Sequence, residues 1–139
     1  MAQDEQAPSK FNVQFRDVTD SQVVIGDYNR VAQTIGLTPQ ETAELKSLFG
    51  EARKRVEEQA EPEQRDQALV QTGELERAVV AEQPDPGRIR NVLRWFKNNA
   101  PQLVGTVVSV VVNPLVGKVV EGAGQAIADQ FHELLKEEL

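Results

Sequence analysis

The side chains that most often carry out catalysis or bind metals are sparse in this sequence of 139 residues. It contains no cysteine, so a thiolate nucleophile, a disulfide and a zinc–thiolate site are all excluded. His132 is the single histidine and stands in an acidic C-terminal stretch. A lone histidine in this setting is typical of a solvent-facing helical position, and we do not expect it to be catalytic or to bind a metal.

Two further patterns contain residue types that occur in binding sites. Asp17, Asp20 and Asp27 are oxygen donors, but their spacing lacks the twelve-residue loop and terminal glutamate of an EF-hand. The glycines within 117–124 do not follow a strand and so do not form a phosphate-binding fingerprint. We therefore interpret the aspartates as turn residues, and we predict a protein without enzyme activity, metal or cofactor.

The charge balance disfavours binding to nucleic acids. Fifteen Lys and Arg stand against 22 Asp and Glu, for a net charge of -7, whereas phosphate neutralisation needs clustered cations. The nearest approach to a basic patch lies in residues 86–97, which we interpret as a solvated helix face. The alternative is an adaptor that binds a partner through Arg90, Arg94 and Trp95 of this stretch.

The N-terminal residues show no targeting signal. Residues 1–10 are polar and are expected to form a disordered tail. They lack the basic start and apolar run of a secretory signal, so we expect a cytoplasmic location.

The segment 11–36 is the part of the chain whose local chemistry favours strands. Phe11, Val13 and Phe15 alternate with polar residues, which predicts a half-buried strand. Residues 21–25 form a second short run rich in β-branched side chains, and a Gly-Asp turn signal follows at 26–27. Residues 28–35 fit a third strand or the approach to a helix. Strands this short need either a covering helix or another copy of themselves.

From residue 38 onward the sequence predicts helices. Thr38 and Glu41 have the spacing of a capping box, and Pro39 suits the first helical position. Apolar side chains then recur at helical spacing, interrupted by QPDPG at 83–87. The expected helices, which together form a domain over 38–139, are 38–59, 62–82, 86–98, 101–112 and 114–137.

The C-terminal segment 101–131 is more apolar than the rest. We predict helices here because Gly105, Ser109, Asn113 and Gly117 recur every four residues, a line of small or polar groups that permits close helix packing. A β-hairpin through 107–112 is the alternative. Residues 103–120 also approach the length of a membrane span, but Asn113, Pro114 and Lys118 are unfavourable in hydrocarbon, so we favour a buried helix pair over membrane insertion.

The run VTDSQVVIGDYN at 18–29 resembles short Ser-Gln-Val-x-Ile-Gly-Asp-x-Asn motifs of bacterial defence and signalling proteins, where the motif accompanies a helical module. It is also similar to the amyloid-type signalling motifs of bacteria and fungi. The residues that carry the resemblance are Ser21, Gln22, Val23, Ile25, Gly26, Asp27 and Asn29. The resemblance implies a module that associates with copies of itself, or with another protein that has a similar β motif.

The sequence taken as a whole predicts an α+β protein, with an N-terminal β element of two or three strands over 11–36 followed by a bundle of four to five helices. The preferred function is a non-enzymatic scaffold in bacterial conflict or signalling that forms a homo-oligomer through its β element, either as a closed assembly or as a fibre. The alternative function is a membrane-perturbing, pore-forming-like effector that uses 101–131.

Overall fold

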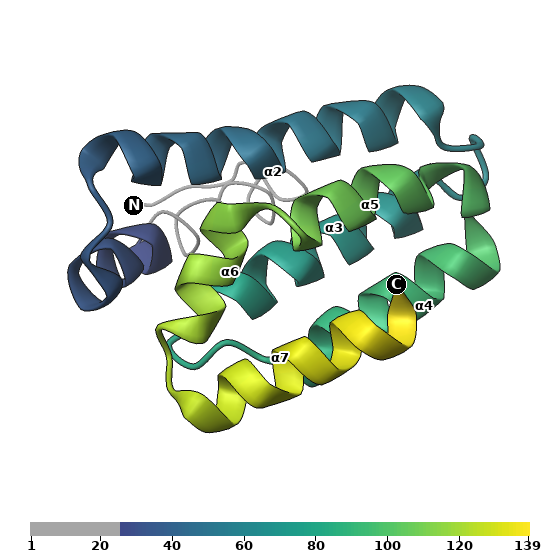
Figure 1. Ribbon diagram of the computed structural model, residues 1–139. Coiled ribbons are helices and arrows are strands. Elements are labelled where there is room, and N and C mark those ends of the chain that lie inside the picture. The colour runs from purple at the N-terminus through teal and green to yellow at the C-terminus, as the bar shows by residue number, and fades with distance from the viewer. Residues whose placement is uncertain (1–25) are drawn as a thin grey trace, which may run out of the picture.

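The computed structural model describes residues 26–139, and this part of the chain consists of helices and turns (Figure 1). The predicted α+β class is therefore wrong for the described residues, which are all-α. Residues 26–27, expected to form a turn, are helical instead, and residues 28–35, expected to form a third strand or the approach to a helix, are helical as well. The rest of the predicted β element, with Ser21, Gln22, Val23 and Ile25, lies outside the described residues.

The helical state of 26–36 follows from the spacing of its apolar side chains. Tyr28, Val31, Ala32 and Ile35 recur at i, i+3, i+4 and i+7, which places them on one face of a helix. Tyr28 and Val31 are buried, and the other two pack partly against the core. The segment is α-helical to residue 31 and π-helical over Ala32–Gly36 (η1). We call residues 26–36 the anchor helix.

A short link joins the anchor helix to α2 (Pro39–Gln59). Gly36 has a φ of 84°, a left-handed conformation that glycine adopts without strain. The predicted capping box is confirmed at the start of α2. The Thr38 hydroxyl accepts a hydrogen bond from the Glu41 amide at 3.0 Å, and the Glu41 carboxylate accepts one from the Thr38 amide at 3.0 Å. These bonds satisfy amide groups that a helix start otherwise leaves unpaired.

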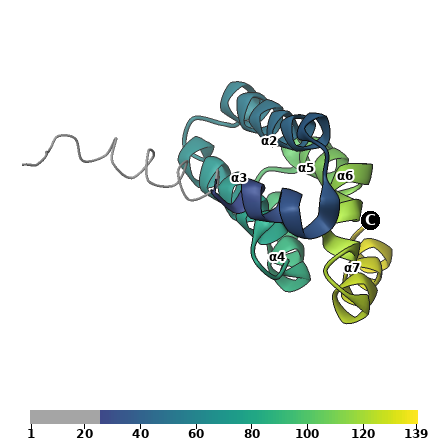
Figure 2. The ribbon, with the colours of Figure 1, turned by 90° about the vertical axis from the view of Figure 1, so that its left-hand side faces the viewer.

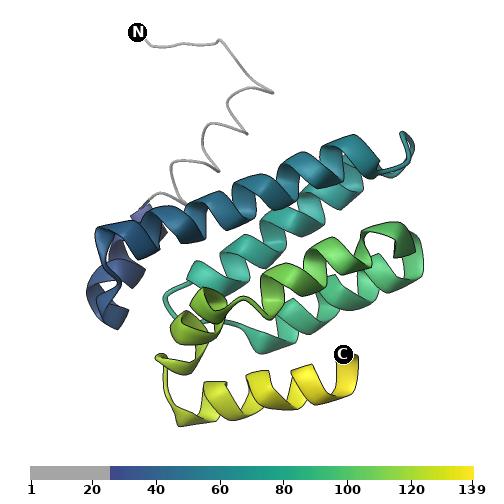
Figure 3. The ribbon, with the colours of Figure 1, turned by 45° about the horizontal axis from the view of Figure 1, so that its top comes forward.

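The remaining helices follow with short connections. Their bounds are α3 (Arg65–Val80), α4 (Pro86–Asn99), the 3₁₀ turn η2 (Pro101–Leu103), α5 (Val104–Val111), α6 (Pro114–Glu121) and α7 (Gln125–Glu138). Figures 1 and 3 show α2, α3, α4, α5 and α7 running side by side in alternating directions. The anchor helix and α6 lie together at one end of this bundle, and Figure 2 looks onto that end.

The C-terminal segment differs from the prediction in two ways. Residues 107–111 belong to α5, so the β-hairpin alternative is wrong. The single helix expected over 114–137 is divided into α6 and α7 at residues 122–124. Gly124 has a φ of 131°, a conformation incompatible with a continuing helix. The break lets α7 change direction and pack along α4.

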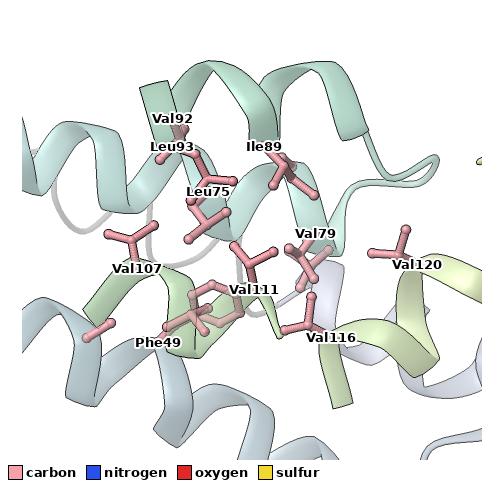
Figure 4. Packing of buried hydrophobic residues seen from close by; sticks show 14 of the residues in the cluster. Phe49, Leu75, Val79, Ile89, Val92, Leu93, Val107, Val111, Val116 and Val120 are labelled. Carbon is pink, nitrogen blue, oxygen red and sulfur yellow. The ribbon is translucent and has the colours of Figure 1, made fainter. Parts of the chain in front are cut away.

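Aliphatic side chains dominate the core, as expected for a sequence with few aromatic residues. Phe49 of α2 and Phe96 of α4 are fully buried among valines and leucines from the other helices. Figure 4 shows Phe49 pointing from α2 toward α5, close to Val111. Burying such side chains stabilises the fold by roughly 1.5–3 kcal/mol each before entropy is counted. The valine-rich α5 lies between α2 and α4, and its buried valines fill the core there.

Candidate functional site

The most distinctive polar cluster in the described residues joins the anchor helix to the bundle. The Tyr28 hydroxyl donates a hydrogen bond of 2.6 Å to Oε2 of Glu76 in α3. The other carboxylate oxygen of Glu76 forms an ion pair with Arg53 of α2. The ammonium group of Lys46, also on α2, lies 5.6 Å from the centre of the Tyr28 ring. One side chain of the anchor helix thus contacts groups from two different helices.

The electrostatics of this cluster explain its composition. The Glu76 side chain is only 3% exposed, and a buried carboxylate is costly unless it is paired and hydrogen-bonded. Tyr28 and Arg53 supply those partners. Burial raises the pKa of the Tyr28 phenol, an effect that the positive charge of Arg53 partly opposes. Burial also lowers the pKa of the Arg53 guanidinium. Tyr28 consequently remains a neutral donor at physiological pH.

Arg30 provides a second attachment of the anchor helix. Its guanidinium donates a 2.8 Å hydrogen bond to the carbonyl oxygen of Val80, the last residue of α3, and contacts Asp27 at 3.1 Å. The final carbonyls of a helix have no partner within that helix, so a cation here satisfies an acceptor and complements the helix dipole. The anchor helix therefore also caps α3.

A groove of about 580 Å³ lies beside the anchor helix. Its walls come from that helix, from the loop between α3 and α4, and from α6. At one side Ile35 packs directly on Gly122, and a Cβ placed on Gly122 would lie 2.9 Å from Cδ1 of Ile35. Glycine thus permits the anchor helix to approach the end of α6 closely.

The predicted self-association residues that the structure describes are divided between exposed and paired positions. Gly26 and Asn29 are exposed, whereas Asp27 is half-buried and paired with Arg30. The sequence prediction missed Tyr28 and Glu76 as partners. A signal for Glu76 was present, because it shares helical spacing with the inward-facing Leu75 and Val79 and so had to be buried. Its partner could not be found from α3 alone.

The predicted line of small residues does not form a helix contact among the described residues. Gly105 and Ser109 are on the exposed face of α5, and a Cβ on Gly105 would meet no neighbour within 4 Å. Asn113 caps α6 instead, since its side chain accepts a hydrogen bond from the Leu115 amide at 2.9 Å. Gly117 belongs to α6, which is bent away from α5, so the four residues do not share one helix face.

Within residues 26–139, no individual helix has both the length and the apolar character to cross a membrane. Pro101–Val111 and Pro114–Glu121 satisfy those two criteria when taken together, but a 60° bend separates them. Val112, at the bend, is 51% exposed. The pair has a buried inner side, and its exposed side carries Gly105, Ser109 and Val112 together with the charged Lys118 and Glu121.

The basic side chains of α4 are engaged within the chain. Arg88 pairs with Glu74 of α3 at 3.2 Å, while Arg90 pairs with Glu137 of α7 at 2.7 Å. Arg94 and Lys97 both contact Glu138, each at 3.0 Å. The pairs with Glu137 and Glu138 join α4 to α7, and the Arg88–Glu74 pair joins α4 to α3. The structure thus gives the α4 cations a role in packing, which weakens the adaptor interpretation of this helix.

Glu138→Gln is expected to destabilise the fold by about 1 kcal/mol at pH 7, the scale of a surface ion-pair network. Hydrogen bonds from Lys97 and Arg94 lower the pKa of Glu138, so its contribution is present above the unfolded pKa and is lost as the pH falls through the folded value. The difference from the unmodified protein should therefore shrink progressively as the pH falls below the unfolded pKa of about 4.3, as measured by urea unfolding over a pH series. Glu133→Gln, exposed on the same helix, is the control. A difference that does not change with pH would contradict the assignment.

The last candidates from the sequence are His132 and a metal site. His132 is exposed and contacts Glu121 across the α6–α7 break at 2.8 Å. No group of three His, Cys, Asp or Glu side chains within 26–139 is placed to hold a metal ion. The site defined by the structure is thus a helix-docking site, in an all-α domain.

No protein-family model, curated protein or solved structure matches the chain.

Proposed function

We propose that this protein is a non-enzymatic, cytoplasmic interaction module that associates with copies of itself through the residues preceding the anchor helix. The observation that carries the proposal is the docking of Tyr28. Its buried hydrogen bond to Glu76 fixes the end of the 18–29 motif to the bundle, with Gly26 exposed at the start of the helix. The chain up to residue 25 is thereby attached directly to a folded domain.

The described residues support the proposal that residues 26–139 form a stable domain while the residues before them make the contact between copies. Every α-helix from α2 to α7 contributes buried apolar side chains to the core. A domain built in this way keeps its own stability while a neighbouring segment contacts another molecule. The resemblance of 18–29 to motifs of bacterial defence and signalling proteins supports the proposal of a role in that context.

Deleting residues 1–25 is expected to abolish self-association while leaving the helical domain folded. The reason is that the deletion removes the proposed contact segment but keeps Tyr28, Arg30 and Ile35, whose described contacts hold the anchor helix. Sedimentation of a concentration series measures the mass, and circular dichroism measures the helix content. In the full chain, Val23→Pro should weaken association because it removes a backbone donor and restricts φ, whereas Ala7→Pro in the polar stretch should not. An unchanged mass after the deletion would refute the proposal.

A second candidate function is perturbation of membranes, favoured by the bent apolar pair 101–121. Val112→Lys tests it, because a lysine at this exposed position reaches water in the folded domain but costs about 2.5–3.5 kcal/mol inside a bilayer. We expect the full chain to release dye from anionic lipid vesicles and Val112→Lys to suppress the release. Val70→Lys, at a position 54% exposed on α3, is the matched control. Absence of leakage, or equal suppression by both variants, would eliminate this candidate.

A further inference from the structure

We propose that the anchor helix is a latch that limits the size of the self-assembled particle: docked, it restricts assembly to a few copies, and released, it becomes the linker that a larger assembly requires. This inference rests on the proposed function, because it concerns how self-association is controlled. It is argued from the attachment, the length and the intrinsic stability of residues 26–36.

The first argument is steric. A domain of about 100 residues has a radius of gyration of about 13 Å and is therefore about 30 Å wide. Chain segments in direct contact lie only about 5–10 Å apart. With Tyr28 held by Glu76 and Arg30 by the Val80 carbonyl, the domain begins immediately after residue 25. If the segments before residue 26 lie side by side at that spacing, the much wider domains attached to them overlap when more than a few copies associate.

The second argument concerns what happens when the anchor helix leaves the bundle. Isolated helices shorter than about 12–15 residues are marginal in water, and 26–36 is shorter than this. It also has glycine at both ends, β-branched Val31, Thr34 and Ile35, and a π-helical last turn. Such a segment does not stay helical once undocked. As extended chain it spans roughly 35 Å, about the width of one domain.

The third argument concerns the contacts that hold the anchor helix. Tyr28 and Val31 join the core cluster, and hydrogen bonds from the Tyr28 hydroxyl and the Arg30 guanidinium add polar attachments. Every helix from α2 to α7 contributes further buried apolar side chains, so the remaining bundle keeps most of its core after the anchor helix leaves. A partner that competes for Glu76 or for the Val80 carbonyl would shift the latch toward release.

A disulfide lock tests the latch in the full chain. Cγ2 of Ile35 lies 3.3 Å from the position of a Cβ on Gly122, and the sequence has no native cysteine. The double variant Ile35→Cys/Gly122→Cys can thus form a single disulfide that holds the anchor helix in place. In sedimentation experiments, the oxidised form should be restricted to small oligomers, and its reduced form should recover the distribution of the unlocked chain.

Two variants act in the opposite direction. A flexible Gly/Ser linker of about twelve residues, inserted between residues 25 and 26, should enlarge the particles without undocking the helix. The linker increases the distance that can separate the contact segment from the domain. Tyr28→Phe removes the hydrogen bond to Glu76 and should raise the undocked population about tenfold. Faster hydrogen exchange at the amides of 26–36 would report that change independently of particle size.

The outcomes separate the latch from the proposed function. If the full chain associates but the oxidised lock and the inserted linker both leave the particle size unchanged, the latch is refuted while self-association stands. If the linker variant itself remains monomeric at every concentration, the proposed function fails, and the latch fails with it. Smaller particles for the lock together with larger particles for the linker support both.

Discussion

Phe49→Ala is expected to lower the free energy of unfolding by about 3–5 kcal/mol. The ring is fully buried and projects from α2 toward α5, in the middle of the valine-rich core (Figure 4). Alanine removes its apolar contacts and leaves a cavity that rigid neighbouring helices fill only partly. Urea unfolding followed by circular dichroism measures the loss as a lower midpoint.

The matched control for Phe49→Ala is Val70→Ala. Val70 is 54% exposed on α3, and removal of exposed methyl groups changes stability by no more than about 0.5 kcal/mol. A loss below about 1 kcal/mol for Phe49→Ala would mean that the packing around α2 and α5 is not the one described. Because a domain of this size has a stability of only about 5–15 kcal/mol, the expected loss is a large share of the total.

Glu76→Leu is expected to cost about 2 kcal/mol, because it leaves the buried hydroxyl of Tyr28 without an acceptor. Arg53, whose side chain is 41% exposed, turns to water and adds little to the cost. The double variant Tyr28→Phe/Glu76→Leu should recover part of the loss, since both members of the hydrogen bond are then apolar. A double-mutant cycle in urea unfolding measures this coupling, which we expect to be about 1–2 kcal/mol. Additive single effects would contradict the described bond.

The same cluster predicts a dependence on alkaline pH. The folded pKa of Tyr28 is raised by burial, so the folded state favours the neutral phenol. That contribution is fully present below the unfolded pKa of about 10 and is lost as the pH rises toward the folded value. Tyr28→Phe should remove this part of the alkaline decline in stability. An equal decline in both proteins would show that another group is responsible.

These predictions also show where sequence reasoning succeeded. The capping box at Thr38, the proline at the start of α4 and the inward faces of α2 and α4 all follow from contacts within one or two turns of a helix. Local rules therefore located these helices within a few residues. The small number of aromatic residues also leaves aliphatic side chains to form most of the core.

Sequence reasoning failed where two local signals competed. Residues 28–35 carry β-branched side chains and follow a strand-like stretch, yet their apolar positions have helical spacing. Burial of Tyr28 against α2 and α3 decides in favour of the helix, and neither helix is near residue 28 in the sequence. In the same way, the line Gly105–Ser109–Asn113–Gly117 assumed one straight axis, which the bend after α5 removes.

The sequence by itself determined the starts of α2, α4 and α6 and the buried faces of α2 and α4, because these depend on neighbours three or four residues apart. It also determined the absence of cysteine chemistry and the acidic balance of charge. Only the tertiary structure decided that Tyr28 forms a hydrogen bond with Glu76, 48 residues away, and that Arg94 and Lys97 of α4 form ion pairs with Glu138. Those pairings depend on how the helices are arranged in space, a property that no local spacing contains.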